Sequence, residues 1–287
     1  MRESGNVNFV HVTPDQRKAF DDDGFLVVRD VLDAGTVAAC LDAGDRLAQP
    51  FLGKSEVLER PEYNHLDFRP GVLTEKPLLD LVSNVTAVSL MLQLLGPNIH
   101  LHSTALIYKR PSRSDAPAFR RGWHRDIRIP KDLGHQFLPR VGIKICYCLT
   151  DFPGPNSGMT LLARGSHQRT GPLVIRKGAV DPEDVELCDL QLGAGDAFLF
   201  DNRLFHTAAP NRSERTSKVL IYGYAFRWMK QEIYLETLDP ACFRQRDPIT
   251  RQLLGAYRDI DTPPWALQDL AKKHGVHPRE IPWTVDT

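Results

Sequence analysis

From residue 99 onward, the sequence consists of short apolar runs separated by glycine, proline, asparagine and aspartate. Short runs with turn-forming residues between them are typical of the strands of a double-sheet barrel or jelly roll. We therefore predict a mainly β fold with flanking helices, whose jelly-roll core covers residues 99–228. The expected strands lie at residues 100–108, 121–127, 142–149, 158–162, 185–190, 197–200 and 218–226.

Residues 1–98 predict a helical flank that contains one strand. Thr13 suits the N-cap of a first helix, and Pro14 suits the first helical position. A glycine and a proline at positions 96 and 97 predict where the last helix of this region ends. The expected segments are a helix at residues 13–22, a strand at 24–28, and helices at 33–47 and 76–95.

The tail, residues 229–287, is rich in proline in its later part, with one helical stretch at about residues 264–274. It lacks the apolar content for a core of its own. We therefore expect it to wrap over the barrel, so that residues 1–287 form a single catalytic domain. A chain of this length is also long enough for two small domains.

The composition gives no reason to expect a nucleic acid or a membrane as partner. Lysine plus arginine and aspartate plus glutamate both number 36, so the formal net charge is zero. We find no apolar run near 18 residues and no signal-peptide pattern, which predicts a cytoplasmic protein. The five cysteines include no C-x-x-C pair, and we expect Cys146 and Cys148 to be buried free thiols. The sequence is compatible with either a monomer or a homodimer.

The candidate metal ligands are His124 and Asp126 together with His206, which follows Asp126 by 80 residues. Residues two apart on a strand project from the same face, and a second histidine from a neighbouring strand can join them. Two imidazoles and one carboxylate that leave open positions suit non-haem Fe(II). An H-x-D match alone is weak, and a purely structural His–Asp pair is the alternative.

Two basic residues are candidates for binding a carboxylate. Arginine matches a planar carboxylate in two-point fashion. Arg215 follows the second histidine, and if it lies on the strand after that histidine it can bind the far carboxylate of a keto acid whose other end chelates the iron. Lys109, at the end of the strand expected at residues 100–108, is a competing candidate.

Four segments in order along the chain closely resemble the phytanoyl-CoA dioxygenase family of iron- and 2-oxoglutarate-dependent oxygenases. They are GWHRD at residues 122–126, GMTLLARGSH at 158–167, GDAFLF at 195–200 and HTAAPNRS at 206–213. The similarity runs from about residue 12 to residue 228. It implies a double-stranded β-helix, a cupin-like jelly roll, which agrees with the strands expected above. It also implies that Fe(II) is bound by His124, Asp126 and His206.

The chain departs from the family at one position. The family usually carries an arginine about eleven residues beyond the second histidine, where this chain has Ser217. Arg215 and Lys218 are the nearest basic residues, and we favour Arg215 because a guanidinium matches a carboxylate in geometry. By the same resemblance, Thr104 and Lys109 lie in a strand that often contributes hydrogen bonds to 2-oxoglutarate.

The resemblance implies a dioxygenase that uses Fe(II), 2-oxoglutarate and O2, with ascorbate as a stimulant. Its expected reaction is hydroxylation, or another oxidation, of an unactivated C–H bond in a small molecule, with release of succinate and CO2. A natural-product intermediate is the favoured substrate class. Asp126 argues against halogenation, because halogenating relatives carry a small residue there. The alternatives are a cupin-like metal-dependent isomerase or epimerase and a non-catalytic jelly-roll binding protein.

Overall fold

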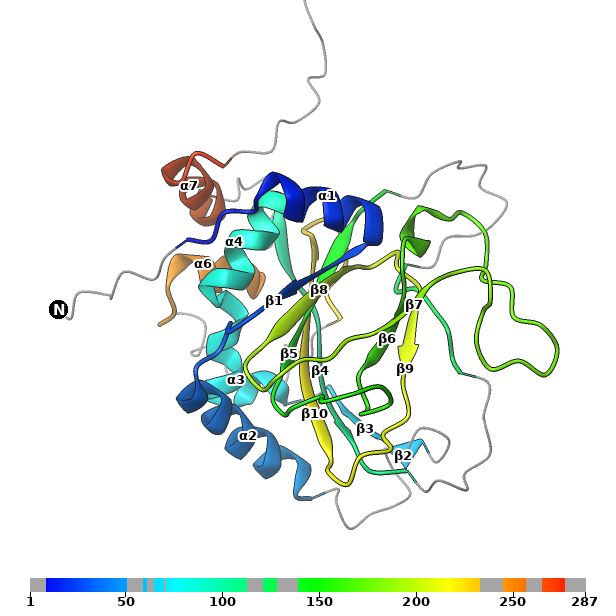
Figure 1. The fold of residues 1–287 in the computed structure, drawn as a ribbon. Coiled ribbons are helices and arrows are strands. Elements are labelled where there is room, and N and C mark those ends of the chain that lie inside the picture. Colours follow the sequence, from blue (N-terminus) through cyan, green and yellow to red (C-terminus); the bar gives the residue numbers. More distant parts are fainter. Residues whose placement is uncertain are drawn as a thin grey trace, which may run out of the picture.

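Two antiparallel sheets face each other in the protein (Figure 1). The computed structural model describes residues 9–50, 59–60, 65–69, 71–112, 121–127, 139–232, 245–256 and 265–276. The large sheet has the strand order β1-β8-β5-β10-β4-β3-β2, and the small sheet has the order β7-β6-β9. Helices cover one face of the large sheet, and the small sheet lies on its other face (Figure 1). The predicted jelly roll with flanking helices is confirmed.

The strands of the large sheet are β1 (Phe25–Val28), β2 (Glu59–Arg60), β3 (His65–Phe68), β4 (Ile99–Lys109), β5 (Gly142–Cys148), β8 (Ala197–Asp201) and β10 (Ser217–Phe226). The small sheet contains β6 (Thr160–Ala163), β7 (Leu187–Asp189) and β9 (His206–Ala208). The helices are α1 (Pro14–Asp23), α2 (Ala34–Ala48), α3 (Lys76–Asp80), α4 (Val85–Leu94), α6 (Pro248–Leu253) and α7 (Trp265–Lys273), with short 3-10 turns at Val72–Thr74, Leu81–Ser83 and Ser166–Gln168.

The N-terminal flank follows the local signals in the sequence. Thr13 and Gln16 form a capping box at the start of α1, and Gly24 ends the helix with a left-handed φ of 83°. The helix expected at residues 76–95 is instead interrupted by a 3-10 turn, after which Asn84 caps α4. By length and composition alone, the stretch Lys76–Leu94 could cross a membrane. A core helix passes the same test, and 67% of this stretch is buried within the fold.

The two faces of the large sheet pack against different partners. Leu220, Tyr222 and Tyr224 of β10 belong to the core cluster on the helix side, and both tyrosine hydroxyls donate to backbone carbonyls there. Val219 and Ile221, on the alternate positions, pack in a second cluster between the two sheets. The strand period of two therefore assigns each side chain of β10 to one layer.

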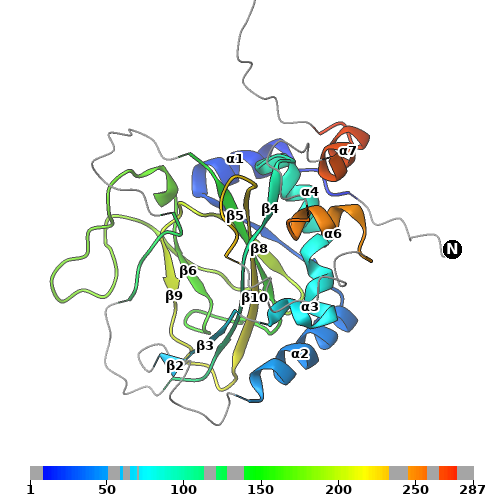
Figure 2. The same cartoon turned by 180° about the vertical axis from the view of Figure 1, so that it is seen from behind.

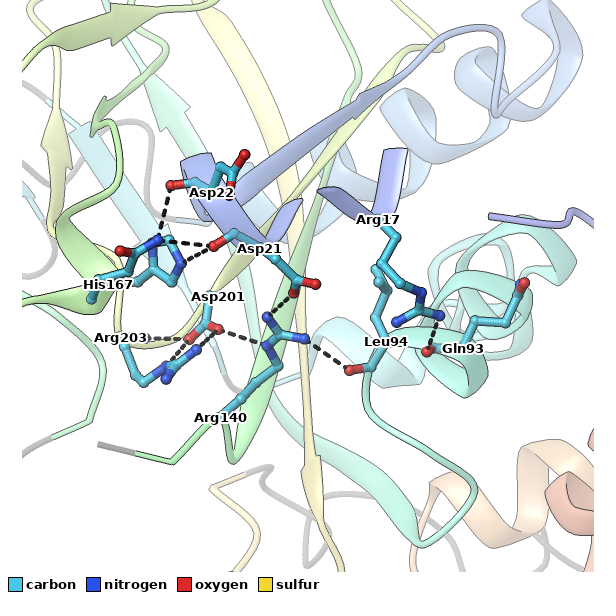
Figure 3. Close-up of polar contacts among 10 residues, drawn as sticks. Arg17, Asp21, Asp22, Gln93, Leu94, Arg140, His167, Asp201 and Arg203 are labelled. Carbon is cyan, nitrogen blue, oxygen red and sulfur yellow. Dashed lines mark hydrogen bonds and ion pairs between the residues drawn. The ribbon is translucent and has the colours of Figure 1, made fainter. Parts of the chain in front are cut away.

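A buried carboxylate ties the end of β8 to the helices (Figure 3). Asp201 is fully buried and forms ion pairs with Arg140 at 2.9 Å and Arg203 at 2.6 Å. Arg140 also pairs with Asp21 of α1 and donates to the carbonyl of Leu94 at the end of α4. Because a buried charge is costly without partners, this network fixes how the helical layer lies on the sheet.

Some expected segments differ from the structure. The strand expected at residues 121–127 is reduced to a single β-bridge between His124 and His206, while β9, which begins at His206, was not expected. In the tail, α7 matches the prediction but α6 was missed. Both helices lie beside α4, on the helical side of the large sheet (Figures 1 and 2). The division into one domain with three parts stays a prediction.

Candidate metal centre

Three side chains from distant parts of the chain meet at one end of the small sheet. The ligand atoms of His124, Asp126 and His206 all lie within 4.8 Å of one another. His206 Nε2 lies 3.8 Å from Asp126 Oδ2, and the two imidazole centroids are 4.3 Å apart. The sequence prediction that these three residues converge therefore agrees with their positions in the structure, whereas their role as metal ligands stays a prediction.

Each imidazole is oriented by its own backbone surroundings. The Nδ1 atom of His124 lies 2.8 Å from the carbonyl oxygen of Gly122, and Nδ1 of His206 lies 2.9 Å from that of Leu204. An imidazole that donates from Nδ1 to a carbonyl presents Nε2 as a lone pair. Both rings can therefore offer Nε2 to the same metal ion.

The two oxygens of Asp126 face different groups. Oδ2 is the oxygen near His206, while Oδ1 forms an ion pair with Lys144 Nζ at 2.8 Å. Lys144 extends from β5, where it lies between Phe200 and Gly223 of the neighbouring strands. Such a contact restricts rotation of the carboxylate and leaves one oxygen for a metal.

Backbone hydrogen bonds fix the segment that carries the first two ligands. His124 and His206 exchange both of their N–H···O bonds, at 3.1 and 2.9 Å. The amides of Asp126 and Ile127 donate to the carbonyl of Asn202, which follows β8. The ligand segment is therefore held to the segment between β8 and β9 although it forms no regular strand.

The side chains on both sides of His124 also fix the position of this segment. Trp123 Nε1 donates to Asp181 at 3.0 Å, and Arg125 lies over the Phe205 ring at 4.0 Å. Arg125 also donates to the carbonyl oxygens of Arg169 and Gly171. Arg125 thus connects the ligand segment to the loop that follows β6.

The protonation states suit a metal site. Burial raises the pKa of the Asp126 carboxyl, but the charges of Lys144 and the two histidines outweigh it and lower the pKa to about 2. Burial lowers the pKa of His206 to about 4, against the opposing effect of Asp126. At neutral pH the site therefore presents a carboxylate and a neutral His206 imidazole, the forms that bind metals. Two nitrogen donors and one oxygen donor fit Fe(II) with open positions.

The residues predicted to bind 2-oxoglutarate lie on different faces of the large sheet. Lys218 is on the helix side, where its Nζ pairs with Asp45 at 2.6 Å and lies over the Tyr108 ring. Thr104 is paired with Tyr222 of the same helix-side cluster, and its hydroxyl lies 3.5 Å from the carbonyl of Arg69. These placements argue against a co-substrate role for either residue.

The other two candidates differ in burial. Arg215 is exposed in the turn before β10, and its backbone carbonyl accepts hydrogen bonds from Asn211 and Ser213. Lys109, at the end of β4, is only 3% exposed, and its Nζ donates to the carbonyl of Ala209. The structure therefore places a buried amine, rather than the exposed Arg215 guanidinium, beside the strand that begins with His206.

Lys144 is a site residue that the sequence prediction missed. It stands in the run GIKICYC of β5, in phase with Cys146 and Cys148, which belong to the cluster between the sheets. A lysine in the inward phase of an apolar strand is a signal that could have identified it.

Comparison with known proteins establishes the family. The model of the phytanoyl-CoA dioxygenase family matches residues 20–219, so the chain belongs to this family. An uncharacterised protein of Mycobacterium tuberculosis is 28% identical over 83% of this chain and 85% of its own length. The ectoine dioxygenase of Nocardia farcinica is 27% identical over 70% of this chain and 73% of its own length.

Solved structures share the fold. HygX from Streptomyces hygroscopicus, with nickel and 2-oxoglutarate bound, has a TM-score of 0.61 at 16% identity and covers 77% of this chain and 90% of its own. The epimerase SnoN, in complex with Fe3+, α-ketoglutarate and nogalamycin RO, has a TM-score of 0.58 at 18% identity and covers 74% and 83%. Iron and 2-oxoglutarate are the cofactors of the family to which this chain belongs.

Proposed function

We propose that this protein is a non-haem Fe(II)- and 2-oxoglutarate-dependent oxygenase in which His124, Asp126 and His206 bind the iron. The observation that carries the proposal is the convergence of these three ligand atoms within 4.8 Å, on a chain of the phytanoyl-CoA dioxygenase family. When bound, iron and 2-oxoglutarate would supply the oxidising chemistry with O2 as the oxidant: one oxygen atom would end in succinate as CO2 is released, and the other in the oxidised C–H product.

The residues of this chain position and tune the centre. His124 and His206 are held in one orientation by carbonyl contacts to Nδ1, and Lys144 holds one oxygen of Asp126. Three protein ligands leave open positions for a chelating keto acid and for O2. Asp126 fills the position that halogenating relatives leave small, so hydroxylation-type chemistry is the proposed outcome.

A small molecule is the proposed substrate. One relative is named for ectoine, and structures of the neighbours SnoN and HygX contain nogalamycin RO and hygromycin B. We favour a natural-product intermediate for this chain. A cytoplasmic location is also proposed, and cell fractionation tests it.

The test is a turnover assay with the purified protein, loaded anaerobically with Fe(II) and then given 2-oxoglutarate, ascorbate and O2. Slow formation of succinate, dependent on iron and O2, is expected even before the primary substrate is known. The His206→Ala variant is expected to form none. A wild-type protein that binds iron and forms no succinate contradicts the proposal and favours a non-oxidative isomerase or a binding protein.

A further inference from the structure

Ser217 stands where the family carries the arginine that binds the far carboxylate of 2-oxoglutarate, so this chain needs another cation for that carboxylate. In the sheet, Ser217 of β10 is paired directly with Lys109 of β4. Side chains of directly opposite residues on antiparallel strands share a face, with Cβ atoms about 4.5–5.5 Å apart. The neighbouring strand therefore presents a lysine beside the position that lacks the arginine.

The face shared by these residues is the one that faces the metal centre. Val219 and Ile221, in phase with Ser217, pack in the cluster between the sheets. Phe200 belongs to the same cluster, and its ring centroid lies 4.7 Å from that of His206. Lys109 is thus on the inner face of the large sheet, whereas Lys218 pairs with Asp45 on the outer face.

Lys109 also lies beside the segment of the second histidine. Its Nζ donates to the carbonyl of Ala209, three residues after His206. Three residues of extended chain span about 10 Å. This is an upper limit on the separation of the His206 and Ala209 backbones, and it is of the order of length of an extended five-carbon diacid attached to a metal.

The Arg121 guanidinium, which pairs with Asp181 at 3.5 Å, and the Asp189 carboxylate both lie near Lys109. Burial lowers the pKa of its amine to about 7, and the nearby Arg121 contributes to this lowering, while Asp189 opposes it. Arg121 is three residues before His124 on the ligand segment. A dicarboxylate brings the negative charge that a buried amine beside a guanidinium favours.

Ser217 itself is packed closely. A Cβ added to Gly158 would come within 2.2 Å of Ser217 Oγ, so the backbone of Gly158 lies directly against this serine. There is little room in that direction for the long side chain that the family carries. The Lys109 amine comes from β4 instead, so it reaches the inner face without occupying the space beside Ser217.

We propose that Lys109 takes the place of the family's arginine and binds the far carboxylate of 2-oxoglutarate. The inference rests on the proposed function, because it presumes that 2-oxoglutarate chelates an iron held by the three ligands. It assigns to the lysine on β4 a role that the sequence alone favoured for Arg215.

The test is an equilibrium titration without O2, in which 2-oxoglutarate is added to the Fe(II)-loaded protein and its visible charge-transfer band is recorded. Lys109→Met is expected to weaken 2-oxoglutarate binding about 10- to 100-fold, the scale of a lost charge-assisted hydrogen bond. The probe 2-oxobutanoate has the same chelating end and no far carboxylate, so wild type and Lys109→Met are expected to bind it equally. Lys109→Arg is expected to retain part of the affinity for 2-oxoglutarate.

Arg215→Met and Lys218→Met are the matched controls, and each is expected to change 2-oxoglutarate affinity less than about twofold. A selective loss of 2-oxoglutarate in Arg215→Met overturns the proposal, as does an equal loss of both keto acids in Lys109→Met. If Lys109→Met does not fold, Lys109→Gln replaces it in the same titration. A normal band in wild type with unchanged affinity in the lysine variants refutes only the role of Lys109. A wild-type protein without any band refutes the proposed function as well.

Discussion

The two faces of the large sheet differ in what their polar groups do. On the helix face, Tyr222 and Tyr224 use their hydroxyls to satisfy the carbonyls of Leu78 and Val82, and Lys218 pairs with Asp45. On the inner face, Lys144 contacts a proposed iron ligand. Polar groups on the helix face therefore complete the packing, whereas Lys144 on the inner face contacts the candidate metal site.

Lys218 and Lys109 show how small a difference in strand position separates the two faces of the sheet. They lie on adjacent strands, and a single residue of register separates the pair Ser217–Lys109 from the pair Lys218–Tyr108. Because side chains alternate along a strand, that offset sends the two amines to opposite faces. The face on which a basic residue lies is therefore decided by its phase in the strand, not by its distance in sequence from the histidine.

The largest effect is expected for His206→Ala. Changes beyond the ligands of metal sites already cost 10- to 100-fold in affinity, so removal of a ligand is expected to weaken Fe(II) binding by more than about 100-fold. The matched control is His167→Ala, since His167 is also buried but contacts the carbonyl of Asp21 (Figure 3). The control is expected to lose stability and keep iron, measured as iron per protein after desalting. Iron retained by His206→Ala would refute the ligand assignment.

On the helix face, Leu220→Ala tests whether packing and chemistry are separable. Leu220 is fully buried, and removal of such a side chain costs about 2–5 kcal/mol in the free energy of unfolding. Urea denaturation measures this loss. The affinities for Fe(II) and 2-oxoglutarate of the remaining folded protein are expected to be unchanged. A parallel loss of metal affinity would break the distinction between the two faces.

Lys109 predicts a pH dependence of stability on the inner face. Its pKa is lowered to about 7 in the fold, beside Arg121 and Asp189, while an unfolded lysine titrates near 10.4. Between these values the unfolded chain binds more protons, so this residue makes stability rise with pH, by up to about 1 kcal/mol per pH unit. Lys109→Met is expected to lack this contribution, so its gain in stability over wild type should be larger at pH 6 than at pH 9. Thermal melts at both pH values measure it, and an equal difference at the two would contradict the account.

Lys144→Met is expected to have the smallest effect of the four. Loss of the ion pair frees Asp126 to rotate, and we expect Fe(II) affinity to fall about 10-fold, the lower end for residues that orient metal ligands. Lys144→Arg is the control that keeps the charge. Competition with a coloured chelator measures both affinities. Unchanged Fe(II) affinity in Lys144→Met would contradict the proposal that Lys144 orients Asp126 for metal binding.

The sequence predicted much of this architecture, because its signals are local. The capping box of Thr13 defines α1, and the long apolar runs define β4, β5 and β10. The convergence of the three proposed iron ligands was also predicted, since ordered family motifs surround them. What failed depends on tertiary contacts. β9 is only three residues long, and the segment of His124 is held by a bridge to it rather than by a ladder of its own.

The sequence could not place the predicted co-substrate residues relative to one another, for the same reason. Arg215 was favoured on side-chain chemistry, and Thr104 and Lys218 on resemblance and proximity, but none of these arguments includes the register between β4 and β10. That register depends on packing across the whole sheet. Once it is known, Ser217 and Lys109 become neighbours, and Thr104 and Lys218 turn toward the helices.

The proposed function depends on one metal ion that is shared by three side chains. Anaerobic crystals soaked with Fe(II) and measured at the iron absorption edge test it most directly. We predict a single anomalous peak bonded to Nε2 of His124, Nε2 of His206 and an oxygen of Asp126. A peak at another position, or imidazoles of residues 124 and 206 that do not share one ion, would contradict it.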